Sequence, residues 1–248
     1  SNPTEVFDNI VVNDRILERA KTVTGSYDDF INNAQHYGSS NLWKFNNEGV
    51  DLGKTELYEL KRKLYRAVMN VNILEGIRFY VSFACSFAFG ELQLMEGSAK
   101  IIKKIAADEH LHLFLTQNII TKWKKGDDPD MKKIAEEETE WTYKMFETAV
   151  DEEKHWAQYL FKDGSMIGLN EKLLCDYVEW MANRRMKAIG LKPLYSIASN
   201  ADPLPWVSEK WLNTRAEQVP PQEENLVSYI VGGLNQDIKP DSFANFKL

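Results

Sequence analysis

The sequence is poor in the residues that build disulfide-rich, turn-rich or nucleic-acid-binding proteins. It contains two cysteines, 13 glycines and 8 prolines in 248 residues. Two cysteines make no disulfide framework, so Cys85 and Cys175, both in apolar surroundings, are expected to be reduced thiols of a cytoplasmic protein. The scarcity of glycine and proline argues against an all-β chain with many turns. Acidic residues outnumber basic ones by 37 to 30, which argues against a nucleic-acid partner bound through a basic face.

The sequence also lacks an apolar run long enough to cross a membrane. The longest run, Ile77 to Phe89, contains Arg78 and ends at Gly90, well short of the roughly 20 residues that a bilayer requires. It is therefore predicted to be a buried helix. No signal peptide is recognisable at the start of the sequence, so neither a membrane nor secretion is expected.

What the sequence does contain is apolar residues at helical spacing, which predicts an all-α protein. Apolar residues recur at intervals of three and four, and polar or glycine-containing turns separate the periodic stretches. Long helices are expected over residues 13–37, 55–90, 96–125, 129–162 and 170–189. Gly76 is a candidate kink within the second helix. Residues 46–53 are predicted to be a connector, and a short turn is predicted around 208–213.

The chain is expected to divide into a helical portion, residues 1–213, and an extended C-terminal tail, residues 214–248. Prolines interrupt any long helix after Lys192, yet the tail keeps many apolar side chains: Leu226, Val227, Tyr229, Ile230, Val231, Phe243, Phe246 and Leu248. Such a composition favours a segment that docks on a partner. The alternative is that the tail wraps its own domain.

A carboxylate and an imidazole lie on the apolar stripe of the helix predicted over 96–125. Glu109 and His112 share a face with Ile102, Ile105 and Leu113. A carboxylate and a histidine one turn apart in a core must be paired, hydrogen-bonded or bound to a metal. Helical bundles with two iron or manganese ions use Glu-x-x-His in this way, together with single glutamates from other helices. The motif alone is weak evidence, because many helices contain it by chance.

Glu75 strengthens the metal hypothesis because it lies in a second apolar stripe, between Val71 and Phe79. A second Glu-x-x-His, Glu152 and His155, falls among charged neighbours and is interpreted as part of a solvated face. Without that pair the candidate ligands are three, whereas two metal ions usually need six. Oxygen-rich ligands with imidazole suit iron and manganese about equally.

The residues around these acids form a longer pattern. It includes Asn72-Ile-Leu-Glu75-Gly-Ile-Arg78-Phe79-Tyr80, Leu94-Met95-Glu96-Gly97, Ala107-Asp108-Glu109-His110-Leu111-His112, Tyr159-Leu-Phe161-Lys-Asp163-Gly164, Pro205-Trp206 and Phe243-Ala-Asn-Phe246-Lys-Leu248. This pattern resembles the small, radical-generating β subunit of class I ribonucleotide reductase, and the similarity runs from about Pro3 to Leu248. The resemblance implies a ferritin-like di-iron helical bundle that serves the reduction of ribonucleotides to deoxyribonucleotides.

The resemblance also implies roles for individual residues. The implied iron ligands are Glu75, Glu109 and His112, and the implied apolar shell around the metal is Phe79, Phe83 and Ile105. Asp108 matches an acid that orients a histidine ligand and belongs to the electron-transfer route. Tyr229 matches the tail tyrosine that passes the radical to the large α subunit, with Glu223 as a proton or contact partner. The segment from Phe243 to Leu248 matches the anchor that docks on the large subunit.

The family pattern includes earlier helices with an Asp ligand, another Glu-x-x-His and the radical-bearing tyrosine, and this sequence does not contain them. It is therefore interpreted as the C-terminal part of a split β subunit, whose incomplete bundle is completed by an N-terminal fragment. Ser1 is compatible with protein splicing, a gene break or a truncation. Completed β units are expected to dimerise. Two alternatives to a reductase subunit are a ferritin-like metal-binding or scaffold protein without radical chemistry and an inactive remnant of a broken gene.

Overall fold

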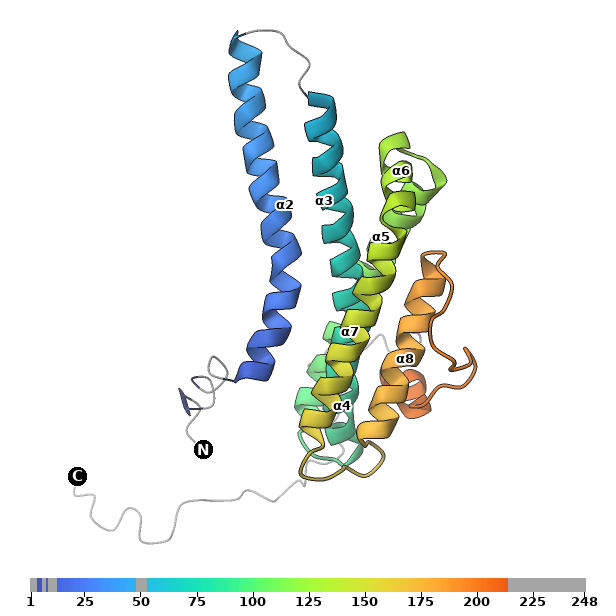
Figure 1. Cartoon of the computed structure of the whole chain (residues 1–248). Coiled ribbons are helices and arrows are strands. Elements are labelled where there is room, and N and C mark those ends of the chain that lie inside the picture. The colour runs from blue at the N-terminus through green and yellow to red at the C-terminus, as the bar shows by residue number, and fades with distance from the viewer. Residues whose placement is uncertain (1–3, 6–7, 9–12, 48–52, 214–248) are drawn as a thin grey trace, which may run out of the picture.

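The structure, a computed structural model, describes residues 4–5, 8, 13–47 and 53–213, and these form a bundle of helices (Figure 1). The named elements are α2 (Asp14–Asn47), α3 (Gly53–Ile73), the π-helix η1 (Leu74–Arg78), α4 (Phe79–Glu91), α5 (Glu96–Lys125), α6 (Pro129–Glu137), α7 (Thr139–Leu160), α8 (Glu171–Ala188) and the π-helix η2 (Val207–Trp211). Within the described ranges no strand is formed beyond one isolated bridge between Met166 and Leu169. The all-α prediction is confirmed.

The helix predicted over 13–37 begins where expected but ends later. The side chain of Asn13 caps it by accepting a hydrogen bond from the Ile16 amide at 3.3 Å, as N-cap residues do. The prediction that this helix ends at Tyr37 is wrong, because α2 continues through Gly38 to Asn47. A single glycine inside a helix costs only about 1 kcal/mol. The predicted connector is correspondingly shorter than 46–53, since Gly53 already belongs to α3.

The helix predicted over 129–162 is two helices, α6 and α7, which meet at Glu138. Asp128 caps α6 through its carboxylate, which accepts hydrogen bonds from two backbone amides, and Pro129 follows at the first helical position. The Glu138 side chain, nearly fully buried, binds Arg66 at 2.8 and 2.9 Å and Arg62 at 3.3 Å. These partners lie on α3, so the local sequence around Glu138 gives no sign of the break. The helices predicted over 96–125 and 170–189 are confirmed as α5 and α8.

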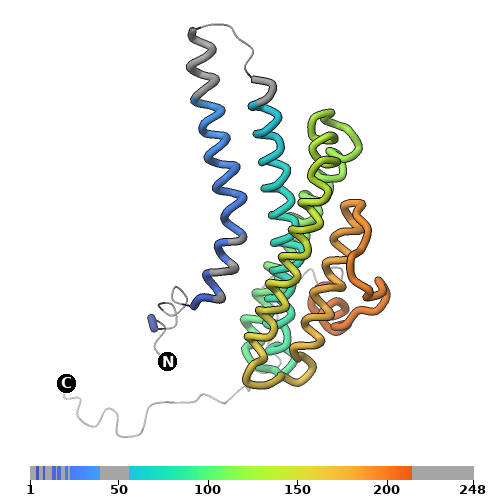
Figure 2. Tube along the Cα trace, in the orientation of Figure 1, coloured from blue at the N-terminus to red at the C-terminus, as the bar shows by residue number. Residues whose placement is uncertain are grey.

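The core lies along α3, η1 and α4, which follow one another without a turn. Figure 2 shows α2 at the edge of the bundle beside α3. The π-helix η1 contacts α5, α7 and α8 as well as its two neighbours in the chain. The most deeply buried side chains of this central run include Met69, Ile73, Ile77 and Phe87. The π-helix therefore occupies the middle of the bundle.

Gly76, the predicted kink, lies within η1. Its carbonyl accepts a hydrogen bond from Arg185 Nε at 3.0 Å, and a Cβ atom there would come within 3.1 Å of the Arg185 and Leu113 side chains. Glycine thus permits α5 and α8 to approach the π-helix closely. Single π-turns within α-helices are rare and are frequently found at functional sites. The residues of η1 are therefore candidates for a functional role.

The structure also describes the two cysteines and the longest apolar run. Cys85 and Cys175 form no disulfide. The continuous helical stretch Glu56–Glu91 is long and apolar enough to meet the criteria for a membrane span, but 61% of its most apolar window is buried inside the protein. Such burial is typical of a core helix, as predicted for Ile77 to Phe89.

Candidate metal centre

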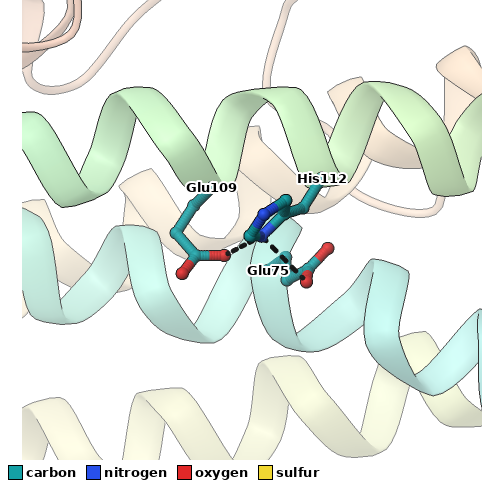
Figure 3. Close-up of side chains that lie close together, drawn as sticks. All are labelled: Glu75, Glu109 and His112. Atoms are coloured by element: carbon teal, nitrogen blue, oxygen red, sulfur yellow. Dashed lines mark hydrogen bonds and ion pairs between the residues drawn. The ribbon is translucent and has the colours of Figure 1, made fainter.

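The structure brings the three predicted metal ligands together. Glu75 is supplied by η1, whereas Glu109 and His112 lie one turn apart on α5, and the three side chains point toward one another (Figure 3). One ligand atom from each lies within 4.8 Å of the others. His112 Nδ1 is 3.2 Å from Glu109 Oε2 and 3.7 Å from Glu75 Oε1. Two carboxylates and one imidazole at these separations could hold a metal ion, and they are the donor types that helical bundles with two metal ions use.

The electrostatics of the cluster leave Glu75 short of partners. Burial and the nearby Glu109 carboxylate raise the pKa of Glu75 to about 7, and His112 opposes this shift. Within the described residues, Glu75 Oε2 is buried and has no hydrogen-bond partner. A buried carboxylate oxygen without a donor is costly. A metal cation bound between Glu75, Glu109 and His112 would relieve that cost, so the residues present fit a metal ion.

The cluster is less buried than its apolar stripe predicts. Glu75 and Glu109 are half-buried, but the His112 side chain is 57% exposed. The buried residues of α5 lie on a different face of the helix. They are Ala99, Ala106, Leu113, Thr116 and Ile120. The prediction that His112 lies in the core of this chain is therefore wrong, because the apolar stripe of α5 is wider than the face its neighbours cover.

Five large apolar side chains of α5 are exposed in the described chain. They are Ile101, Ile105, Leu111, Phe114 and Leu115. At 100° per residue, Ile101 and Ile105 project about 20° from His112 and Leu115 about 60°, whereas Leu111 and Phe114 project about 100° and 160° from it. Exposed apolar side chains on one side of a helix are typical of an interaction site. We call Ile101, Ile105 and Leu115, which lie on the same side of α5 as His112, the open face of α5.

The predicted apolar shell is only partly assembled. Phe83 is buried and Phe79 is half-buried, and their ring centroids are 6.1 Å apart. Ile105 belongs to the open face of α5 and is 41% exposed. Phe79 also lines a cavity of about 410 Å³ between α2 and the central run, together with Ile16 and Leu74. The shell role of Phe79, Phe83 and Ile105 stays a prediction.

The remaining predicted functional residues are not brought to the cluster. Asp108 is exposed, and it makes no hydrogen bond or ion pair with the residues that the structure describes. Its predicted role of orienting a histidine ligand is therefore not visible here. Tyr229, Glu223 and the anchor from Phe243 to Leu248 lie outside the described residues, as does the whole predicted tail, 214–248.

The discarded pair Glu152 and His155 was predicted to belong to a solvated face. His155 is exposed, which confirms the prediction for this residue, but Glu152 is half-buried and binds Arg78 at 2.6 Å. What the sequence did not reveal is that the neighbouring Glu153 is fully buried, with Oε1 3.2 Å from the same arginine. Arg78 is the last residue of η1, so this ion pair fixes the π-helix to α7. The only sequence signal was a lone arginine within the apolar run from Ile77 to Phe89.

A second residue that sequence reasoning missed is Tyr27 on α2. Burial raises the pKa of the Tyr27 hydroxyl, and the Glu75 carboxylate contributes to the same shift. Tyr27 is therefore close enough to sense the charge of the candidate ligand. Its position in α2 gave no signal, because its proximity to Glu75 depends on how α2 packs on the bundle.

The fold and the cluster together define a helical-bundle protein with a carboxylate–histidine group that could hold a metal ion. The family model for the ribonucleotide reductase small chain matches residues 1–203. This chain belongs to that family, and its ferritin-like fold follows from it.

Individual relatives agree with this assignment. The chain is 47% identical to ribonucleoside-diphosphate reductase 1 subunit beta of Salmonella typhimurium and 48% identical to the subunit beta of Haemophilus influenzae, in each case over 100% of this chain and 65% of the relative. The subunit beta of Enterobacteria phage T4 is 36% identical over 66% of its length. A solved ribonucleotide reductase R2 subunit from Clostridium botulinum superposes with a TM-score of 0.63 at 30% identity, covering 84% of this chain and 57% of that one. The chain thus spans about two thirds of the length of these curated relatives.

Proposed function

We propose that this chain is the C-terminal part of a ribonucleotide reductase small subunit and contributes half of the ligands of a di-iron centre. The observation that carries the proposal is the cluster of Glu75, Glu109 and His112, with a buried Glu75 oxygen that lacks a donor. Family membership favours iron, although the donor set would also accept manganese. The enzyme reduces ribonucleotides to deoxyribonucleotides for DNA synthesis and acts in the cytoplasm.

The remaining ligands come, in this proposal, from an N-terminal fragment of the subunit. The three ligands of the cluster are half of a six-ligand site. The open face of α5 supports the proposal, because it leaves apolar side chains uncovered on the same side of the helix as His112. Helices packed on this face would exclude water from His112 and enclose Ile105, whose predicted shell role requires a dry environment. The cavity of about 410 Å³ is lined by Phe79 and by Leu74, the residue before Glu75.

The residues of this chain would then hold the metal and protect it. Glu75, Glu109 and His112 bind, and Phe79, Phe83 and Ile105 exclude water and stray reductants. When iron is bound, the centre supplies the oxidising equivalent that starts ribonucleotide reduction. Asp108, next to Glu109, belongs to the path for an electron and orients a histidine ligand once the bundle is complete.

The tail, 214–248, has the second role. Tyr229 passes the oxidising equivalent onward to the large catalytic α subunit, and Glu223 accepts a proton or contacts that subunit. The apolar segment from Phe243 to Leu248 docks on the large subunit. Two completed β units form a dimer.

Reconstitution tests the proposal. This full chain is mixed with a polypeptide that spans the part of the Haemophilus influenzae relative which it does not match. Iron is counted by mass spectrometry, and a tyrosyl radical is sought by EPR. The expected result is two irons and a radical from the complex but not from this chain alone. Two irons and a radical from this chain by itself would refute the split site.

Two variants separate metal binding from a general loss of structure. Glu109→Ala is expected to abolish iron loading of the complex, whereas Glu136→Ala, an exposed acid on α6, is expected to load fully. Truncation after Glu217 is expected to leave iron loading intact and to abolish binding to the large subunit. A ferritin-like scaffold without radical chemistry would retain its function after that truncation.

A further inference from the structure

A basic cavity lies on the side of α5 opposite to the metal cluster. It has a volume of about 150 Å³ and is bordered by α4, α5, α8 and η2. The basic residues of its walls are Lys103, His110, Arg184 and Arg185, and no aspartate or glutamate of the described chain lines it. His110 and His112 are two residues apart, so they project about 200° apart around the helix. The cavity is therefore separate from the candidate metal centre.

Arg185 is the innermost of these cations. It is 9% exposed, donates its Nε hydrogen to the Gly76 carbonyl at 3.0 Å, and lies over the Tyr80 ring at 4.7 Å. Both partners are neutral, and no ion pair to Arg185 forms among the described residues. A buried guanidinium normally has a carboxylate or another anion beside it.

Other arginines of the described helices show what this fold does elsewhere. Arg62, Arg66 and Arg78 each bind at least one glutamate. Arg185 is buried, as Arg78 is, yet it faces a cavity instead of an acid. The missing negative charge is therefore a feature of this cavity and not of buried arginines in general.

The other cations are arranged around the opening. Arg184 is exposed and lies 4.5 Å from the centroid of the Trp180 ring. His110 is also exposed, and its Nδ1 is 3.4 Å from the Tyr80 hydroxyl. Together with Arg185, these side chains give the cavity a basic lining, and none of the described residues that line it is an acid.

We propose that this cavity binds a phosphate group, with Arg185 at its floor and Arg184, His110 and Lys103 at its opening. Two guanidinium groups suit an oxyanion because each presents several N–H donors in a fixed plane. At roughly 30 Å³ per water molecule, the cavity holds about five waters, which is room for one phosphate group but not for a nucleoside. A phosphate that belongs to a nucleotide would leave its base outside, next to Arg184 and Trp180. The source is thus either free phosphate or the terminal phosphate of a nucleotide.

Calorimetric titration of the full chain tests the site, in metal-free buffer at fixed ionic strength. The probes are inorganic phosphate and, separately, ADP. Saturable binding at one site with a Kd below about 1 mM is expected. Arg184→Gln, a change at an exposed position, is expected to weaken binding about tenfold, because one charge-assisted contact is lost. Lys172→Gln removes a cation from the same helix but away from the cavity, and is expected to bind as the parent chain does.

A second variant protects the test against misfolding. Arg185→Lys keeps the positive charge and loses the planar fork, and circular dichroism reports whether it folds. If it folds, phosphate binding is expected to weaken at least as much as in Arg184→Gln; if it does not, Arg184→Gln decides. Binding of ADP at least tenfold tighter than phosphate would assign the site to a nucleotide, and equal binding would assign it to free phosphate. The proposal is overturned if phosphate and ADP both fail to saturate, or if Arg184→Gln binds as tightly as Lys172→Gln.

Discussion

Two charged clusters include residues of the π-helix η1, and they differ in how their carboxylates are partnered. At one end, Arg78 is buried and binds Glu152 and Glu153 of α7. At the other end, Glu75 faces Glu109 and His112, and one of its oxygens is buried without a donor. In the first cluster both carboxylates bind the permanently charged Arg78, whereas in the second two carboxylates share one imidazole and one Glu75 oxygen has no donor. The comparison teaches that the Arg78 cluster holds the helices together and that the Glu75 cluster is prepared for a cation.

The Arg78 cluster is expected to give the largest effect on stability. Arg78→Met removes the guanidinium that binds the fully buried Glu153, which is expected to lower the free energy of unfolding by about 3–5 kcal/mol. Urea unfolding followed by circular dichroism measures this change. Lys172→Gln, which breaks the exposed pair with Asp176, is the control and is expected to cost less than about 1 kcal/mol. Equal losses in the two variants would remove the distinction between the clusters.

The Glu75 cluster is expected to behave in the opposite way in the metal-free chain. The folded-state pKa of Glu75, about 7, lies above the ordinary value of 4.5, so the ionised carboxylate destabilises the fold. That penalty develops as the pH rises from 4.5 to 7 and is complete above 7. Glu75→Gln is therefore expected to raise the free energy of unfolding by about 2 kcal/mol at pH 8. Near pH 4.5 the variant and the parent should coincide. A variant that is less stable than the parent at pH 8 would contradict the prediction.

The pH dependence of metal affinity is a further test of the Glu75 cluster. Glu75 must lose its proton before it can bind a metal ion, and half of the Glu75 carboxyls are protonated near pH 7. Apparent affinity for Mn²⁺ is expected to fall about tenfold per pH unit below that value. Calorimetric titrations at pH 6 and pH 8 measure the difference. An affinity that does not change between these two pH values would show that Glu75 is not a ligand.

The smallest effect on stability is expected on the open face of α5. Leu115→Ser is expected to change the free energy of unfolding by less than about 0.5 kcal/mol, because the side chain is already exposed. The same change is expected to weaken binding of the N-terminal fragment, measured by analytical ultracentrifugation of the mixed polypeptides. Ile167→Ser, at an exposed position between α7 and α8, is the control. If both variants bind the fragment equally well, the open face is not the docking surface.

The sequence predicts the parts of this protein that local pattern determines. Apolar spacing located α5 and α8, and the Glu-x-x-His motif together with Glu75 identified the cluster before its geometry was known. The break at Glu138 was missed because it depends on Arg62 and Arg66 from another helix. The burial of Glu153 was missed for the same reason. Periodicity placed His112 in the core, but periodicity cannot tell which part of an apolar stripe the chain itself covers.

Metal binding by the full chain alone tests the central claim most directly. Calorimetric titration with Mn²⁺ at pH 8 is expected to show one ion bound per chain, lost in Glu109→Ala and retained in Glu152→Gln. Glu152 lies on α7 and binds Arg78 at the other end of η1. Its replacement by Gln removes a carboxylate away from the metal cluster, so this variant controls for the loss of negative charge. Equal binding by Glu109→Ala and Glu152→Gln would contradict the claim that Glu75, Glu109 and His112 form a metal site.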